Sequence, residues 1–462
     1  MDLSYLLCAI VLLPGLTFAA LGISWLLGWQ PRERLVARLT ALCYSLAAAA
    51  TAWLWIGMAS AGQHSLTVSL GDWFKVEEYS FPLTLMVDRL SLPLVALSVL
   101  LVGVVGVFSV RYLHRDPGFH RFFLLLNLFG FGVLLLFTVG SFDLLIGGWE
   151  LVGLTSVLLI AFFQHRDDPV KNALRVFATY RACDIGLLVG VVMMHHFAGS
   201  AAFSALLDGN WPNAGTALSG GSATLIGFLL LLAAMGKAAQ VPFSGWLPRA
   251  MEGPTPSSAI FYGALSVHAG AYLLLRAQPI LEASTLVKET VIVIGLLTAL
   301  HGTFVGRACA DAKTSLAYAS MTQLGVIFME IGFGLTWLAL LHICGHAVVR
   351  TLQFLRAPSM LHDFHRVHAA AGGHLGETGA HYEQLLPEVA QGWLYRLALD
   401  RGHHDTFLDR FVIAPVLRVA GRLNRFEMEW IAYVAGPHKR RRRLAAKAGV
   451  HRFNQTTEDA NV

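Results

Sequence analysis

Two charged residues of opposite sign stand inside long apolar runs of this sequence. Glu150 lies in Gly-Gly-Trp-Glu-Leu-Val-Gly-Leu, and Lys237 lies in Met-Gly-Lys-Ala-Ala-Gln-Val-Pro. An ionisable side chain at membrane depth is costly, so it normally faces a partner, a cavity or an ion path. Two such residues on helices close in sequence predict a site that handles protons or cations. A buried ion pair that only braces two helices is the alternative.

Other ionisable residues in apolar runs are further candidates for an ion path. Arg181 and Asp184 are three residues apart, so they share a helix face and can pair. His342, His346 and Arg350 recur at every fourth residue, which predicts a polar stripe along one helix. Histidine exchanges protons near neutral pH, so this stripe suits proton transfer. The remaining candidates are Asp88, His268 and His301.

The histidines also allow two plainer interpretations. A lone histidine in a helix often only makes a packing hydrogen bond, and for His342 and His346 this is as well supported as a polar conduit. Their spacing could also hold a metal ion, but the sequence offers no nearby carboxylate or third ligand. No dinucleotide or P-loop glycine pattern is present either. We therefore expect no metal, nucleotide or other cofactor in this chain.

Prolines cluster directly after Lys237. Pro242, Pro248, Pro254 and Pro256 follow it within twenty residues. Proline removes a backbone donor and interrupts a helix. Interrupted helices are tolerated in membranes where they line a cavity enclosed by protein. The prolines therefore favour an ion path at Lys237 over a buried ion pair that only holds two helices together.

The elements that position these residues must be membrane-spanning helices. Hydrophobic residues make up 55% of the chain and charged residues only 14%, against about 25% charged in ordinary soluble domains. We expect an all-α polytopic membrane protein, and the scattered cysteines read as small apolar residues. Hydropathy predicts about eleven spans, near 3–27, 35–58, 83–109, 119–139, 142–163, 171–197, 222–244, 255–276, 286–306, 315–334 and 336–356.

Basic residues collect in alternate connections between the spans. The first connection holds Arg32 and Arg34, whereas the even connections hold little beyond Lys75 and Lys288. The positive-inside rule therefore places the odd connections and the C-terminus in the cytoplasm and the N-terminus outside. The first run lacks a basic segment before it, so we expect a retained helix rather than a cleaved signal.

The composition changes after residue 356. Residues 357–404 are rich in histidine and charge, but their spacing matches no compact zinc template, so we expect a polar cytoplasmic segment. Residues 405–436 predict an amphipathic helix at the membrane interface or against a partner. Residues 437–462 form a basic tail that we expect to be disordered. Beside a membrane domain, such a tail favours lipid over nucleic acid.

Several stretches of the sequence together carry a family resemblance. They are Asn-Leu-Phe-Gly-Phe (127–131), Gly-Trp-Glu-Leu-Val-Gly-Leu (148–154), Arg-Ala-Cys-Asp (181–184), Gly-Lys-Ala-Ala-Gln-Val-Pro (236–242), Gly-Pro-Thr-Pro-Ser-Ser-Ala (253–259), Asp-Ala-Lys-Thr-Ser-Leu-Ala-Tyr-Ala-Ser-Met-Thr-Gln-Leu-Gly (311–325) and His-Ile-Cys-Gly-His (342–346). These stretches resemble the antiporter-like membrane subunits of respiratory complex I and of Mrp-type cation/proton antiporters. This resemblance implies an inverted-repeat fold, with repeat one over about 119–276 and a partial repeat two over about 286–356.

The resemblance also implies roles for individual residues. Glu150 and Lys237 match the family's ion pair, whose opening and closing drives proton movement. Arg181 and Asp184 match charged positions on the sixth helix, and Lys313 matches the lysine that opens the tenth span.

The sequence departs from the family pattern in three places. Tyr262 stands where the family usually has a proton-relaying His or Lys, and Arg350 stands where it usually has Lys. The eleventh span leads directly into polar sequence, whereas the family continues into a second broken helix. We therefore expect a second repeat that is cut short.

The segment that starts at Arg350 and runs to Gly-Gly-His-Leu-Gly (372–376) resembles the DabB family, the membrane subunits of DAB-type inorganic-carbon accumulation complexes. This resemblance implies an inner-membrane subunit that is not an enzyme and couples a proton or sodium gradient to its partner. The partner is a large cytoplasmic DabA-like subunit with a carbonic-anhydrase-like zinc site, and a dimer of such heterodimers is one arrangement that it allows. The alternatives are a complex I or Mrp-type subunit and a non-conducting membrane anchor for a cytoplasmic enzyme.

Overall fold

The apolar runs of the sequence form long helices. The computed structural model describes residues 3–29, 31–76, 79–309, 311–357, 387–403 and 409–434. Among these residues, ten helical segments are long and apolar enough to cross a membrane, which confirms a mostly helical membrane fold; the strands described below are the departure from the expected all-α fold. They are α1 (Leu3–Leu26), α2 (Glu33–Ser60), α3 (Ser91–Tyr112), α4 (Phe119–Thr138), α5 (Phe142–Ile160) with the short turn η1 (Ala161–Phe163), α6 (Asp167–Ala198), α8 (Gly220–Lys237), Thr255–Arg276, α13 (Thr285–Gly306) and α15 (Thr336–Arg356).

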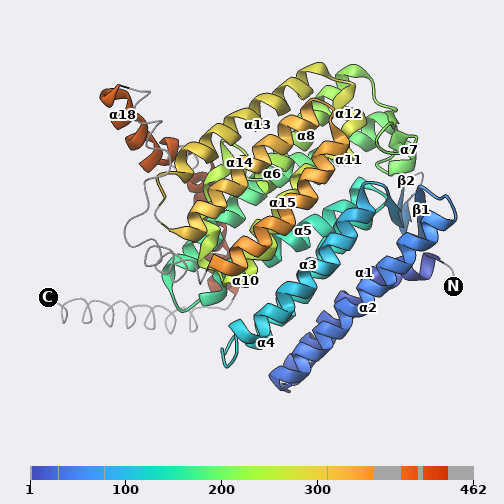
Figure 1. The fold of residues 1–462 in the computed structure, drawn as a ribbon, viewed down its shortest axis with the longest axis horizontal. Coiled ribbons are helices and arrows are strands. Elements are labelled where there is room, and N and C mark those ends of the chain that lie inside the picture. Colours follow the sequence, from blue (N-terminus) through green and yellow to red (C-terminus); the bar gives the residue numbers. More distant parts are fainter. Residues whose placement is uncertain are drawn as a thin grey trace, which may run out of the picture. The chain divides into compact units, whose positions relative to one another are not determined.

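The eleventh predicted span is helix α14 (Ala312–Gly332). It is long enough to cross a membrane but carries too many polar residues to be counted among the ten. It packs between α13 and α15, and these helices run side by side in Figure 1. Its polar residues are therefore placed against other helices, where partners are available.

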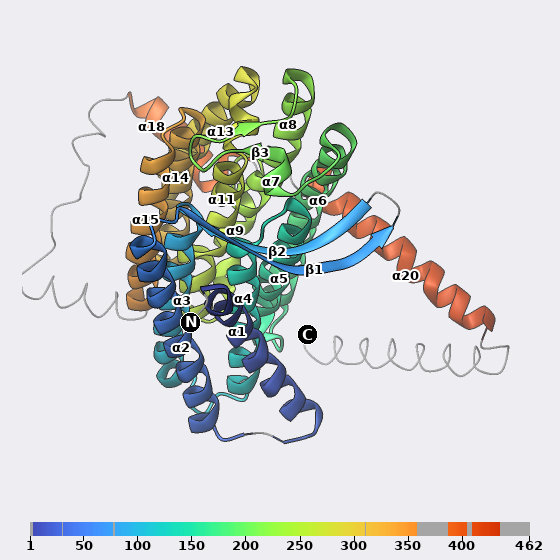
Figure 2. The same ribbon diagram turned by 90° about the vertical axis from the view of Figure 1, so that its right-hand side faces the viewer.

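The predicted span at 83–109 begins too early. Residues up to Asp88 belong to a β-hairpin of β1 (Ser65–Val76) and β2 (Tyr79–Asp88), with Ser65 opposite Asp88. The stretch Ser-Leu-Thr-Val-Ser-Leu (65–70) alternates polar and apolar residues, which is the pattern of a strand. The hairpin projects from the helices in Figure 2. A prediction from hydropathy alone therefore assigned part of β2 to the membrane span.

A buried ion pair holds the base of the hairpin. Arg276, at the end of α11 (Ala269–Arg276), donates to both carboxylate oxygens of Asp88 at 2.6 and 3.0 Å. Asp88 Oδ1 also accepts from the backbone N–H groups of Leu90 and Ser91 at the start of α3. Both partners are buried, with exposed fractions of 8% for Asp88 and 3% for Arg276. The pair therefore ties α3 to α11.

Replacing Arg276 by methionine should destabilise the protein strongly. The Asp88 carboxylate would remain buried without its cation, which typically costs about 3–5 kcal/mol of unfolding free energy. Thermal unfolding in detergent measures the loss. Arg89→Met is the matched control, because Arg89 is exposed and its guanidinium group lies 3.1 Å from the ring of His64. Equal destabilisation by both variants would contradict this account.

The chain between α8 and α11 is broken into short pieces. After Lys237 the backbone leaves the helix at Ala239, whose φ is +50°. This confirms the predicted interruption. Then follow η2 (Phe243–Gly245), α9 (Trp246–Arg249), η3 (Ala250–Glu252), α10 (Thr255–Ser257), the π-helical turn η4 (Ser258–Ala264) and η5 (Ser266–His268).

The predicted single span 255–276 is therefore interrupted at its middle. It is wholly buried inside the protein, so its freed backbone groups face protein rather than lipid. A π-helical turn inside a helix frequently marks a functional site. His268 lies at the end of this irregular stretch.

Short elements gather at the hairpin end of the helices in Figure 1. The ring of Trp337, in the first turn of α15, lies 4.9 Å from the ring of Trp211 at this end. The start of α15 therefore lies beside these elements, which are α7 (Phe203–Leu206), β3 (Leu207–Asp208), β4 (Gly215–Thr216) and α12 (Gln278–Glu282).

The C-terminal part of the chain is described only in pieces. Most of the His-rich segment, residues 358–386, and the basic tail 437–462 lie outside the described residues. Residues 387–403 contain α18 (Glu388–Leu399) and the turn η7 (Arg401–His403). The described residues 409–434 belong to a second unit of the chain and contain η8 (Asp409–Ile413) and α20 (Ala414–Val434). Placement of α20 at a membrane surface stays a prediction.

Candidate ion-translocation site

The Lys237 side chain is wholly buried. Its Nζ has no hydrogen-bond partner among the described residues. Instead it lies 4.1 Å from the ring centroid of Tyr180 on α6 and 5.3 Å from that of Trp149 on α5. Aromatic faces attract a cation but accept no strong hydrogen bond from it. We call Lys237, Trp149 and Tyr180 the lysine site.

Gly153 on α5 makes the room for this ammonium group. A Cβ at Gly153 would lie 2.3 Å from Lys237 Nζ. A Gly153→Ala variant should therefore fold, because a flexible side-chain end can move, but its lysine would be displaced. Ion movement should fall by about 100-fold, as displacements near 1 Å can cost in a reacting site.

Ion uptake by proteoliposomes that contain the complete assembly measures this loss. Gly147→Ala is the control on the same helix, because a Cβ there would meet its nearest atom, Leu135 Cδ2, at 3.9 Å. If both alanine variants moved ions at the wild-type rate, the position of Lys237 would not matter.

A second group of charges lies on α5 and α6 beside the lysine site. Arg181 donates to Glu150 and also to Asp184 Oδ2, the latter at 2.8 Å. Trp149 Nε1 donates to the other Asp184 oxygen at 2.6 Å. Asp184 is buried, whereas Glu150 and Arg181 are each about one third exposed. The predicted pairing of Arg181 with Asp184 is confirmed.

The expected ion pair between Glu150 and Lys237 is not formed in this structure. The carboxylate of Glu150 binds Arg181, which reaches it from the neighbouring helix α6. Trp149 contacts both groups, because its ring faces Lys237 while its N–H binds Asp184. The arrangement is one in which Glu150 and Lys237 are apart and Arg181 holds the carboxylate.

Polar groups connect α5 to the irregular stretch before α11. Ser156 Oγ lies 3.3 Å from Ser266 Oγ, and Tyr262 donates to the Ser156 carbonyl at 3.3 Å. Tyr262 is buried, and its ring packs against Trp246. Ser266 is two residues from His268. Tyr262 thus lies between the lysine site and His268, at the position where the resemblance implies a relay.

His268 and His346 form a buried hydrogen-bonded pair. His268 Nε2 lies 2.9 Å from His346 Nδ1, and His268 Nδ1 bonds the carbonyl of Ala264. Arg350 Nε donates to His346 Nε2 at 3.4 Å. Because a carbonyl only accepts and a guanidinium only donates, His346 Nδ1 donates to His268 Nε2. Both rings are therefore neutral, and an extra proton on His346 requires Arg350 to move away.

His342 lies one turn before His346 on α15, with ring centroids 6.4 Å apart. Its two nitrogens contact oxygens of Glu330 at 2.9 Å and Gln323 at 3.0 Å, both on α14. The expectation that no carboxylate lies near these histidines is therefore wrong. Glu330 is twelve residues away in sequence, and only the packing of α14 on α15 brings it to His342.

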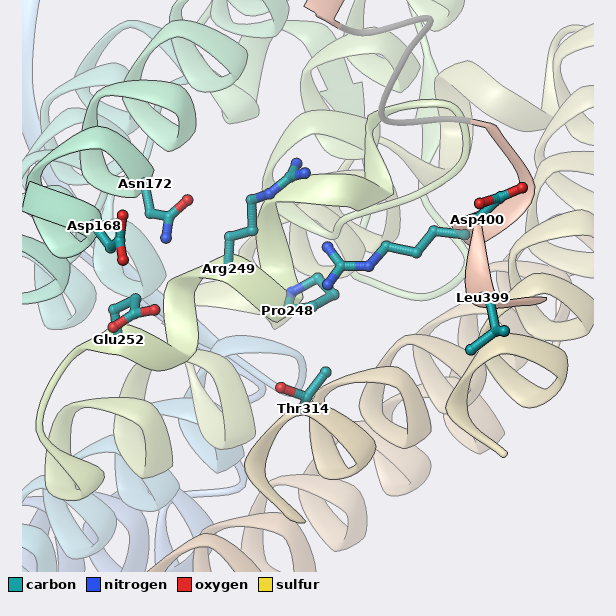
Figure 3. A pocket seen from close by; sticks show the side chains of 9 residues that line it. Asp168, Asn172, Pro248, Arg249, Glu252, Thr314, Leu399 and Asp400 are labelled. Atoms are coloured by element: carbon teal, nitrogen blue, oxygen red, sulfur yellow. The ribbon is translucent and has the colours of Figure 1, made fainter. Parts of the chain in front are cut away.

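Lys313 lies apart from the lysine site and from the histidines. It is the second residue of α14, and its Nζ donates to the carbonyls of Met251 and Gly253 at 2.7 and 3.1 Å. The next residue, Thr314, borders an open polar pocket of about 510 Å³. Figure 3 shows this pocket with Asp168 and Glu252 on one side and Asp400 on the other. Lys313 therefore links α14 to the loop that borders a water-accessible pocket.

Two kinds of residue at the candidate site could not be, or were not, recognised from the sequence. Trp149 and Tyr180 look like ordinary core aromatics in sequence, and nothing there marks them as neighbours of a lysine. Glu330 did carry a signal, because it is a carboxylate inside the predicted span 315–334. The rule that singled out Glu150 applies to it equally.

Comparison with known proteins shows which family this chain belongs to. A family model described as "NADH:quinone oxidoreductase/Mrp antiporter, TM" matches residues 141–373, half of the 462-residue chain. The chain belongs to this family. A second model, "NADH-Ubiquinone oxidoreductase (complex I), chain 5 N-terminus", matches residues 73–123. The lysine site and the histidines all fall within the first match.

Curated relatives in this antiporter-like family match more than three fifths of the chain. NADH-ubiquinone oxidoreductase chain 5 of Schizophyllum commune is 36% identical over 64% of this chain and 43% of its own length. NADH-quinone oxidoreductase subunit L of Mycobacterium tuberculosis is 36% identical over 61% of this chain and 44% of its own length. The chain thus spans less than half the length of these relatives, which are subunits of larger complexes.

Solved structures support the same antiporter-like fold. The Mrp complex from Dietzia sp. DQ12-45-1b matches with a TM-score of 0.65 and 27% identity, covering 75% of this chain and 37% of that one. The membrane-bound sulfane sulfur reductase, an archaeal respiratory complex, matches with a TM-score of 0.62 at 17% identity, over 76% and 70% of the two chains. The second likeness concerns the fold alone.

Proposed function

We propose that this chain is the ion-translocating, energy-coupling membrane subunit of an inorganic-carbon accumulation complex of the DAB type. In this role it couples a proton or sodium gradient to a large DabA-like cytoplasmic partner. Catalysis lies in that partner, whose zinc site hydrates carbon dioxide. The chain sits in the inner membrane with its N-terminus outside and its C-terminus in the cytoplasm.

The observation that carries the ion-translocating part is the environment of Lys237. Its ammonium group is wholly buried beside two aromatic faces, at the end of a broken helix. This burial costs stability, and a residue that only held two helices together could avoid that cost. Glu150 is the nearby carboxylate that can change partner, because Arg181 also binds Asp184 and keeps one anion when Glu150 leaves. Movement of Glu150 from Arg181 to Lys237 would change the charge at the lysine site and shift a proton or cation.

From the lysine site the proposed path continues towards the histidines. Ser156 and Ser266 lie next on this route, and then His268 and His346. Arg350 stays charged at any working pH and cannot readily release a proton. It therefore acts as a gate on His346 rather than as a carrier. Lys313, beside the open polar pocket, is the proposed contact with the cytoplasmic side.

The inorganic-carbon part of the proposal rests on sequence resemblance. The segment from Arg350 to residue 376 resembles the DabB family, although most of it lies outside the described residues. The His-rich segment and the C-terminal amphipathic helix are the proposed docking region for the partner. Membrane lipid is the proposed contact of the basic tail.

A second candidate function is a proton-translocating subunit of a complex I or a Mrp-type antiporter. The 36% identity to chain 5 and subunit L of quinone oxidoreductases favours it. Both candidates use the same lysine site, so they differ in partners rather than in ion chemistry.

Isolation of the tagged full-length chain from its own membranes separates the two candidates. One large companion that binds zinc would support the inorganic-carbon complex. Many redox subunits would support complex I, and several further antiporter-like subunits would support a Mrp-type antiporter. Either of these two results would overturn the primary proposal.

A further inference from the structure

A carboxylate that no role accounts for lies near the hairpin end of the helices. Glu330 is two residues before the end of α14, and its side chain is only 13% exposed. Its Oε1 lies 2.9 Å from His342 Nδ1. Its Oε2 is buried and has no partner among the described residues. Burying a carboxylate oxygen without a hydrogen-bond partner costs stability. Its presence here therefore points to a functional use.

The contacts of His342 define where its protons can be. Gln323 Oε1 lies 3.0 Å from Nε2, so Nε2 carries a hydrogen and donates to it. Nδ1 faces Glu330 Oε1, and one proton must lie between these two atoms for a hydrogen bond to form. That proton sits either on Glu330, with a neutral ring, or on His342, with a carboxylate. Transfer breaks one O–H bond and makes one N–H bond, with no other reactant.

We infer that Glu330 is a proton-carrying residue of the ion path and forms a proton-sharing couple with His342. The inference rests on the proposed function, because it gives the path its entry on the hairpin side. His342, His346 and Arg350 follow one another along α15, and the rings of His342 and His346 have centroids 6.4 Å apart. The couple therefore lies one helical turn from the neutral pair of His346 and His268.

The distances along α15 support this placement. From His342 to Gln353, which accepts from Arg350 at 2.8 Å, the helix rises by roughly 16 Å. This is about half of the ~30 Å hydrocarbon thickness of a bilayer. Trp337 fixes the start of α15 beside Trp211, at the end that carries the hairpin. Glu330 therefore stands between that surface and the buried histidines.

An isosteric substitution separates proton carriage from simple bracing. Glu330→Gln keeps the size of the side chain and can still hydrogen-bond His342, but it cannot carry a proton. Proton uptake by proteoliposomes containing the complete assembly should fall by about 100-fold, which is the lower range for loss of a general acid–base group. Glu330→Asp, which keeps the carboxyl group, should restore a measurable part of the uptake.

Glu289→Gln is the matched control, because Glu289 is an exposed carboxylate near the same end of α13. It should leave uptake at the wild-type rate, and thermal unfolding should show all four proteins folded. Wild-type uptake by Glu330→Gln, or a wild-type assembly that takes up sodium but no protons, would overturn the inference. Absence of both proton and sodium uptake by the wild-type assembly would instead overturn the proposed function. Equal loss in the Gln and Asp variants would also overturn the inference, since packing rather than the carboxyl group would then matter.

Discussion

Replacing Lys237 by methionine is expected to abolish growth that depends on accumulated inorganic carbon. The test strain lacks its own carbonic anhydrase, and under the proposed function the wild-type complex should rescue its growth in air. Methionine fills nearly the same space between Trp149 and Tyr180 but carries no charge. Without a cation at this place, Glu150 has only Arg181 to bind, and its change of partner cannot occur. Rescue should fall to the level of the empty strain.

The same variant should be at least as stable as the wild type. Lys237 Nζ has no hydrogen-bond partner among the described residues, so removing the charge relieves a desolvation cost on the order of several kcal/mol. Thermal unfolding in detergent should therefore give an equal or higher midpoint, with the partner still bound. The control is Lys171→Met, whose lysine is 71% exposed. Rescue by Lys237→Met at the control's level would contradict an ion-handling role.

Glu150→Gln is expected to have a similarly large effect for a different reason. Glutamine can still accept a hydrogen bond from Arg181, and Arg181 also keeps its ion pair with Asp184. The fold should therefore survive. The neutral amide has no electrostatic attraction to Lys237, so the side chain stays beside Arg181. Ion movement should therefore fall by about 100-fold or more.

Ion uptake by proteoliposomes and the growth assay both measure this effect. Asp167→Asn is the control, since Asp167 is an 89% exposed carboxylate at the start of α6 that pairs with Lys171 at 3.7 Å. Glu150→Asp should keep partial uptake because it preserves the charge on a shorter side chain. Loss of folding in Glu150→Gln would point to a bracing role for the carboxylate instead.

The four charged residues in and beside the lysine site could be predicted from the sequence by one physical rule. Charges are expensive inside apolar helices, and this rule alone selected Glu150, Lys237, Arg181 and Asp184. It could not tell which cation would hold Glu150. Arg181 and Lys237 lie on different helices, and helix rotation and side-chain reach decide between them. Neither is visible in a linear pattern.

The errors in the fold have equally specific causes. The hairpin was missed because β2 is apolar enough to extend the hydropathy of α3, although its neighbour 65–70 alternates as a strand does. The break at His268 has no proline within it, since Pro254 and Pro256 stand well before it, so only burial of the whole segment shows how it is tolerated. Glu330 was missed because its partner His342 belongs to the next helix.

The departures from the family pattern gain meaning from the structure. Tyr262 occupies the implied relay position, but its hydroxyl donates to the backbone of Ser156. In the proposed path it therefore positions the backbone between the lysine site and His268 and is not a proton carrier. Arg350 contacts His346 and Gln353, which suits a gate. Whether the inverted repeats run as the resemblance implies stays a prediction.

The central claim is that ions cross this protein by way of Lys237. Uptake into proteoliposomes under an imposed membrane potential tests it most directly, with wild-type and Lys237→Met assemblies incorporated in equal amounts. A pH-sensitive dye and a sodium-sensitive dye are followed in parallel, so that either ion is detected. The account predicts uptake of one ion by the wild type and only the empty-liposome background for Lys237→Met. Equal uptake by the two assemblies would contradict it.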